Sequence, residues 1–252
     1  MGTSSIYKGP GGSNKLLPDW IQESDLSDKQ KNEIAAEWKA AKATFTKAIN
    51  SSKNSGNFSN KFLQHYSKAY GGSKGFIQSS KSFLTSFGLL HSFVYDLAHQ
   101  GINQTIRNLG DDFQGKNIKE ILVIFSNECF PSGNTKEEAA VREAMVKTLE
   151  LIYKEISQHK QINLLDSSVL NIILQNYISE YISARILSDL GSSFETSKIN
   201  VPEVKTFETK VKDLIFSCVE NKVKNIDFIK IDKGKIDISN LLGECVKELW
   251  GE

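Results

Sequence analysis

Hydrophobic residues recur along most of this chain at the three- and four-residue spacings that place them on one face of an α-helix. The first such face consists of Ile34, Trp38, Ala41, Phe45 and Ile49. The same spacing predicts further helices, with apolar positions within residues 62–70, 76–97, 118–125, 145–156, 169–190, 204–218 and 239–250. We therefore expect a mainly α fold, a single globular domain of seven or eight helices.

Polar residues at two helix starts support these predictions. Ser27 precedes Gln30 by three positions, and Thr135 precedes Glu138 by three. This is the spacing of a capping box, in which the two side chains satisfy free backbone amides at the start of a helix. We therefore expect helices to begin at both places.

Two stretches of the chain depart from the helical period. Ser, Asn and Gly residues fill 50–60, which predicts a loop. In residues 226–238, Ile226, Phe228, Ile236 and Ile238 surround Lys233-Gly234, a pattern that indicates a small β-hairpin.

The first residues are unlike the rest, because Gly, Ser and Pro dominate them and Gly9-Pro10-Gly11-Gly12 breaks any regular element. We expect residues 1–25 to be a flexible N-terminal tail and residues 26–252 to form the helical body. An extended tail of about 20 residues can reach roughly 65 Å. It could thus enter a pocket of another protein while the body stays outside.

Charge is distributed unevenly along the 252 residues, although 31 Lys and Arg nearly balance 30 Asp and Glu. No Asp or Glu occurs from Trp38 to Tyr95, while eight Lys do. A basic docking surface in this acid-free segment would involve Lys39, Lys42, Lys47, Lys61, Lys68, Lys74 and Lys81. The segment could bind nucleic acid or an acidic protein, or it could be a solvated helix face. The use of Lys rather than Arg favours a protein over specific DNA readout.

The rest of the chain shows no motif that points to catalysis, so we expect no enzyme activity and no metal. His91 and His99 lie eight residues apart without a third ligand nearby, and the three Cys are too far apart for zinc spacing. Reduced thiols, the absence of an apolar signal sequence, and the lack of an apolar run of about 20 residues predict a cytoplasmic protein with no membrane partner.

The chain starts with Met1-Gly2, and the small side chain of glycine permits removal of the initiator methionine. The exposed Gly2 α-amine would have a reference pKa of about 7.7–8.0, so a useful fraction is neutral and nucleophilic near neutral pH. Without a Cβ, this amine could enter a narrow pocket and attack an activated carboxyl group.

The opening MGTSSIYKGPGGSNKLLPDW resembles the N-terminus of the QatB family, a component of the four-gene Qat anti-phage defence system. The segments Tyr70-Gly71-Gly72-Ser73 and 129–144 are similar to family segments as well. The resemblance spans roughly residues 1–150, and the closing third looks generic.

The resemblance implies three partners: a QueC-like enzyme (QatC), an ATPase (QatA) and a TatD-like nuclease (QatD). It also implies that the QueC-like enzyme joins a 7-deazaguanine to Gly2 through an amide, a covalent adduct in place of a bound cofactor. Residues that would be recognised in this modification are Thr3, Ser4, Ser5, Tyr7, Gly9, Pro10, Gly11, Gly12, Pro18 and Trp20. The alternative is a helical adaptor that binds nucleic acid or an acidic protein through residues 38–95.

Overall fold

The computed structural model describes residues 27–55, 60–110, 115–129, 135–158, 167–191 and 201–252. Over these ranges the chain forms nine α-helices and a 3₁₀ turn, with no β-strand. The elements are α1 (Asp28–Ser55), α2 (Lys61–Tyr70), α3 (Gly72–Gln78), α4 (Lys81–Leu109), α5 (Ile118–Cys129), α6 (Lys136–Gln158), α7 (Ser167–Gly191), α8 (Val201–Val223), η3 (Phe228–Lys230) and α9 (Ile238–Trp250). The predicted mainly α fold is confirmed.

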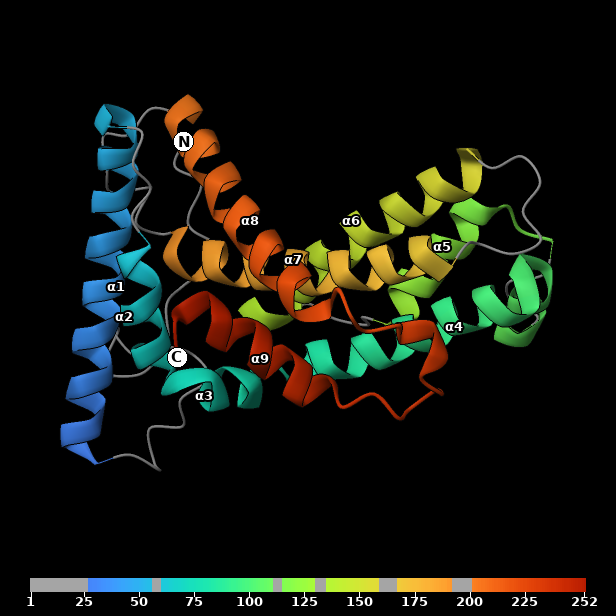
Figure 1. Ribbon diagram of the computed structural model, residues 1–252, viewed down its shortest axis with the longest axis horizontal. Helices are drawn as coiled ribbons and strands as arrows, with labels where there is room; N and C mark the ends of the chain where they lie inside the picture. Colours follow the sequence, from blue (N-terminus) through green and yellow to red (C-terminus); the bar gives the residue numbers. More distant parts are fainter. Residues whose placement is uncertain (1–26, 56–59, 111–114, 130–134, 159–166, 192–200) are drawn as a thin grey trace, which may run out of the picture.

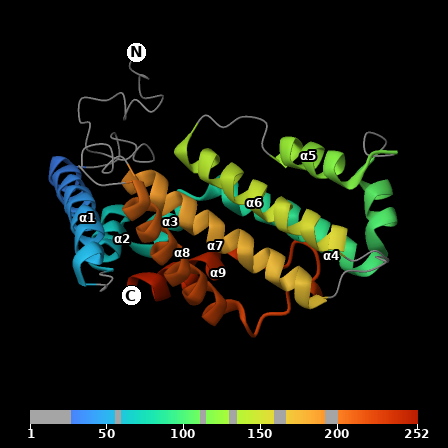
Figure 2. The same cartoon turned by 90° about the horizontal axis from the view of Figure 1, so that it is seen from above.

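Helix α7 is central to the fold. It packs along α6 and α8 and also contacts α4, while α1 and α2 lie side by side at one end of the long axis (Figures 1 and 2). Its side chains from Tyr177 to Ile186 are almost all buried, including those on opposite sides of the helix. A helix with apolar residues all round its surface has to be covered on every side, which accounts for this position.

Among the described residues of the acid-free segment, the aromatic side chains from Trp38 to Phe93 are buried. The ring centroid of Phe45 lies 5.0 Å from that of Phe62 and 5.1 Å from that of Phe207, which joins α1, α2 and α8. Phe83 of α4 stacks on Tyr181 of α7 with centroids 4.1 Å apart. Such pairs contribute about 0.5–1.5 kcal/mol beyond the area they bury. These aromatic residues therefore pack in the core, and the exposed lysines lie on the opposite side of the helices.

Two glycines allow α3 to pack closely against its neighbours. A Cβ on Gly75 would lie 1.8 Å from the carbonyl oxygen of Tyr70, and one on Gly243 would lie 2.9 Å from Cδ1 of Ile77. The first contact is with rigid backbone, so no side chain fits at position 75. Glycine at these positions brings α3 against the end of α2 and against α9.

Both predicted capping boxes are present. The backbone amide of Ser27 donates to Gln30 Oε1 at 3.0 Å, and the amide of Gln30 donates to Ser27 Oγ at 3.4 Å. Thr135 and Glu138 make the same reciprocal pair at 3.0 and 3.1 Å. The starts of α1 and α6 are therefore fixed by side chains that the sequence identifies.

The β-hairpin predicted for residues 226–238 is wrong. The chain there forms η3 and then enters α9. The carboxylate of Asp227 accepts a hydrogen bond from the amide of Ile229 at 3.3 Å, and that of Asp237 accepts one from Asn240 at 3.0 Å. Both carboxylates cap helical turns, so the local hydrogen bonding favours helix over strand despite the apolar pattern.

The end of α1 and the course of α4 also differ from what the apolar spacing alone predicts. Helix α1 continues to Ser55, well into the stretch of 50–60 predicted as a loop. Gly101, with φ 74° and ψ 167°, bends α4. Gly88 lies in an uninterrupted part of the same helix.

The proposed division of the chain stays a prediction. Residues 1–26 lie outside the described part, so the tail of 1–25 and its boundary with the body of 26–252 are not tested.

Candidate functional site

The residues proposed for modification and recognition lie outside the described part of the chain. These are Gly2, Thr3, Ser4, Ser5, Tyr7, Gly9, Pro10, Gly11, Gly12, Pro18 and Trp20. Their roles stay predictions, and the structure bears on the helical body alone.

The lysines of the acid-free segment whose side chains the structure describes divide into one half-buried residue and a group of exposed ones. Lys42 is half-buried, with its Nζ 5.5 Å from the centre of the Trp38 ring. Burial lowers the pKa of Lys42, and the nearby charge of Lys136 lowers it further. The exposed lysines, none of which forms an ion pair within the described residues, are Lys39, Lys47, Lys61, Lys68, Lys74 and Lys81.

Four of the exposed lysines belong to the solvent faces of α1 and α2, which pack along each other. We call this the lysine face. On α1 the exposed positions at helical spacing are Ala36, Lys39, Ala43, Lys47 and Asn50. On α2 they are Lys61, Gln64 and Lys68. From position 38 onward, then, the described solvent side of these two helices carries Lys and small or neutral residues, without a carboxylate.

Two carboxylates near the α1–α2 end of the molecule make contacts with residues other than the exposed lysines. Glu37 Oε2 lies 2.7 Å from His65 Nδ1. The side chain of Glu252 accepts hydrogen bonds from Ser67 Oγ and, at 3.3 Å, from the amide of Ser73. Both acids thus make their contacts with other residues, and neither forms an ion pair with the exposed lysines of α1 and α2.

Behind α2 lies a buried polar cluster that the sequence analysis missed. Asp189 Oδ2 accepts hydrogen bonds from the hydroxyls of Tyr66 at 2.8 Å and Tyr70 at 2.6 Å. Arg185 Nε donates to the Tyr70 hydroxyl at 3.0 Å and lies 3.4 Å from Asp189 Oδ2. Arg185 and Asp189 are only 2% and 1% exposed. We call these four residues the Asp189 cluster.

The Asp189 cluster joins two elements and is sealed from solvent. Burial raises the pKa of Tyr66 and that of Tyr70 well above their usual value, so both phenols stay protonated and donate to Asp189. Because Tyr66 and Tyr70 belong to α2 and Asp189 to α7, the cluster fastens the α1–α2 end of the molecule to the central helix. No substrate can reach these groups without unfolding, so their role is structural.

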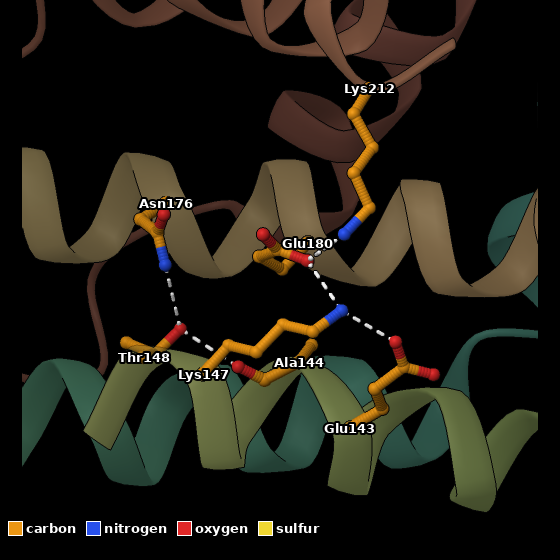
Figure 3. A network of polar contacts seen from close by, with 7 residues as sticks. All are labelled: Glu143, Ala144, Lys147, Thr148, Asn176, Glu180 and Lys212. Atoms are coloured by element: carbon orange, nitrogen blue, oxygen red, sulfur yellow. Dashed lines mark hydrogen bonds and ion pairs between the residues drawn. The ribbon is translucent and has the colours of Figure 1, made fainter. Parts of the chain in front are cut away.

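A second polar network holds the other side of α7 (Figure 3). Lys147 of α6 donates to Glu180 of α7 at 3.0 Å and to Glu143 at 2.5 Å, and Lys212 of α8 lies 3.4 Å from Glu180. Burial by itself would lower the pKa of Lys147, but hydrogen bonds to the two carboxylates raise it on balance. Each charge in the network has an opposite partner, so we assign it to helix packing.

His91 and His99, which lie eight residues apart in the sequence, have different surroundings in the structure. His91 is buried and its Nε2 lies 3.0 Å from the carbonyl oxygen of Phe228, whereas His99 is exposed. In the part of the chain that the structure describes, no group of three metal-ligating side chains occurs. Burial raises the pKa of the Cys245 thiol to about 12, so this thiol is unreactive. The side chain of Cys129 lies outside the described residues.

A groove of about 410 Å³ lies beside α8, η3 and α9, with Phe228 among its apolar lining. Two lysines on its rim are neutralised: Lys222 lies 3.1 Å from Glu248, and Lys235 lies 2.8 Å from Asp232. The groove therefore offers mainly apolar surface. Its lining includes Ile226, Phe228 and Ile236, which belong to the segment 226–238 for which the hairpin was predicted.

Among the described helices, none is both long and apolar enough to cross a bilayer.

Comparison with known proteins gives one match. The family model of QatB, described as a Qat anti-phage system associated protein, matches residues 71–250. No curated protein and no solved structure matches the chain. The matched stretch runs from the end of α2 to the end of α9, so it includes the closing third that looked generic in the sequence.

Proposed function

The chain belongs to the QatB family of Qat anti-phage system associated proteins, and from this premise we propose that it is a defence component that serves as the protein substrate of a QueC-like partner enzyme. The family match supports the defence role. The Met1-Gly2 start and the Gly- and Ser-rich residues that follow support Gly2 as the acceptor.

The proposed reaction forms an amide on Gly2 after Met1 has been removed. The Gly2 nitrogen attacks the carboxyl carbon of a 7-carboxy-7-deazaguanine that the partner enzyme has activated with ATP. The C–N bond forms, the activating group leaves with its bonding electrons, and the amine gives up a proton. In this proposal the helical body docks the enzyme, and the residues before α1 carry the amine into its active site.

A second candidate function is favoured by the unpaired lysines on α1 and α2. In that case the chain is an adaptor that holds nucleic acid or an acidic protein, and the first residues are incidental. The two candidates differ in what they require of the N-terminus.

Deleting residues 2–12 separates the two candidates. We expect cells that carry the complete defence system with this deletion to be as sensitive to phage as cells without the system, because the acceptor and its recognition residues are gone. The measurement is phage plating efficiency, with the amount of the protein checked by immunoblot. A matched control replaces Ser13 and Asn14 with alanine and should protect fully. Full protection by the deletion variant would contradict the substrate role and favour the adaptor.

A further inference from the structure

We propose that the lysine face of α1 and α2 is a docking site for an acidic protein surface. The proposal deepens the proposed function and rests on it only in the choice of proteins to test. Its basis is the charge, exposure and spacing of the four lysines.

The four lysines of the lysine face form no ion pair with carboxylates of the described chain. Lys39, Lys47, Lys61 and Lys68 are exposed and form no ion pair within the described residues. Lysines elsewhere in the fold are often neutralised, as shown by Lys222, Lys233, Lys235 and Lys247, each of which lies within 3.1 Å of a carboxylate. A cluster of one sign without counter-charges attracts the opposite sign and speeds association with it.

The lysine face presents its charges at regular spacing along two helices. Lys39 and Lys47 are eight residues apart on α1, about 12 Å along the helix axis, and Lys61 and Lys68 are about 10 Å apart on α2. Ala43 lies between the two lysines of α1 and Gln64 between the two of α2, and these side chains are short or neutral. Small residues between long cationic ones let another surface approach closely while the lysines reach its carboxylates. The matching partner carries acids about two helical turns apart.

The charge of the rest of the chain and the lack of Arg favour a protein over nucleic acid as the partner. Outside residues 38–95 the chain has 23 basic and 30 acidic residues. A long polyanion would extend past the lysine face onto this net-negative remainder and be repelled, whereas a compact acidic patch would not. The lysine face also has no Arg, the residue whose planar fork binds phosphate through two hydrogen bonds. These features fit a limited, carboxylate-rich protein surface.

The test compares two variants with the same change in charge. One carries Lys39→Glu, Lys47→Glu, Lys61→Glu and Lys68→Glu. The matched control reverses four exposed lysines elsewhere: Lys119, Lys154, Lys205 and Lys224. Circular dichroism and thermal unfolding establish that both variants are folded. Binding is measured by biolayer interferometry against the purified QueC-like enzyme, ATPase and nuclease of the same system, against duplex DNA, and against the chain itself.

We expect one of the three system proteins to bind the wild-type chain and the control. The lysine-face variant should associate about tenfold more slowly at low salt, and the difference should shrink as salt screens the charges. Four results would each overturn the docking site: no binding by any system protein, equal loss in both variants, binding of DNA alone, or self-association alone.

Intact mass of the wild-type chain and of the lysine-face variant, each purified from cells that carry the complete system, separates this proposal from the proposed function. If a system protein binds through the lysine face while Gly2 stays unmodified, the substrate role fails and the docking site stands. If Gly2 is modified and binding does not depend on the four lysines, the docking site fails and the substrate role stands.

Discussion

Replacing Asp189 with alanine is expected to lower the free energy of unfolding by about 3–5 kcal/mol. The change removes the acceptor for Tyr66 and Tyr70 and leaves the Arg185 charge in a site that is 2% exposed. An uncompensated buried charge costs more than the pair contributes, because water cannot reach it. Urea unfolding followed by circular dichroism measures the loss, and the α1–α2 end should become the first part to exchange its amide hydrogens.

Two controls identify the Asp189 cluster as the cause. Asp232→Ala removes a carboxylate that lies 2.8 Å from Lys235 on the surface, and it should leave the unfolding midpoint unchanged because exposed pairs contribute little. The double variant Arg185→Met with Asp189→Leu removes both buried charges and should be more stable than Asp189→Ala alone. If Asp189→Ala unfolds at the wild-type urea concentration, the cluster does not hold α2 to α7.

Gly2→Pro is expected to abolish phage protection while leaving the helical body folded. After removal of Met1, the acceptor would be a secondary amine, and the proline ring would crowd the nitrogen and hinder its attack on an activated carboxyl group in a narrow pocket. The hydrogen bonds and core contacts described for the helical body are all made among residues 27–252, so thermal unfolding should match wild type. The measurement is plating efficiency in cells that carry the complete system.

The control for Gly2→Pro is Gly2→Ala, which keeps a primary amine and adds one methyl group. It should retain more protection than the proline variant. Ser13→Pro places the same ring eleven residues later and should protect as wild type does. Protection by Gly2→Pro at the wild-type level would rule out the Gly2 amine as the acceptor.

Much of the fold follows from local sequence because its helices are amphipathic and capped. Ser27 with Gln30 and Thr135 with Glu138 are satisfied within four residues, so their positions need no tertiary information. A third capping box, in which the Asn117 and Glu120 side chains bond each other's backbone amides, starts α5. The same spacing could have revealed it had Asn been admitted as a cap alongside Ser and Thr.

The features that sequence reasoning missed depend on contacts between distant segments. Asp189 meets Tyr66 across 123 positions, so no local pattern could pair them. The signal that was present is a charged pair, Arg185 and Asp189, one turn apart in a helix that is otherwise buried. In the same way, the hairpin predicted at 226–238 rested on apolar residues alone and left out the caps of Asp227 and Asp237.

The candidate site, too, could be predicted from the sequence only in part. The acid-free composition of 38–95 was visible in the sequence, and the structure adds that Lys42 packs over Trp38 while the other described lysines on α1 and α2 face solvent. Composition cannot distinguish these two states, because exposure depends on how α1 packs against α2, α7 and α8.

The mass of the intact chain, purified from cells with the complete system, tests the substrate role most directly. We expect the loss of Met1 together with an increase equal to one 7-deazaguanine acyl group, and fragmentation should place that increase on Gly2. Deleting the gene for the QueC-like enzyme should return the mass to that of the chain without Met1. A mass that corresponds to Met1 removal alone, with the enzyme present and the system active against phage, would contradict the proposed function.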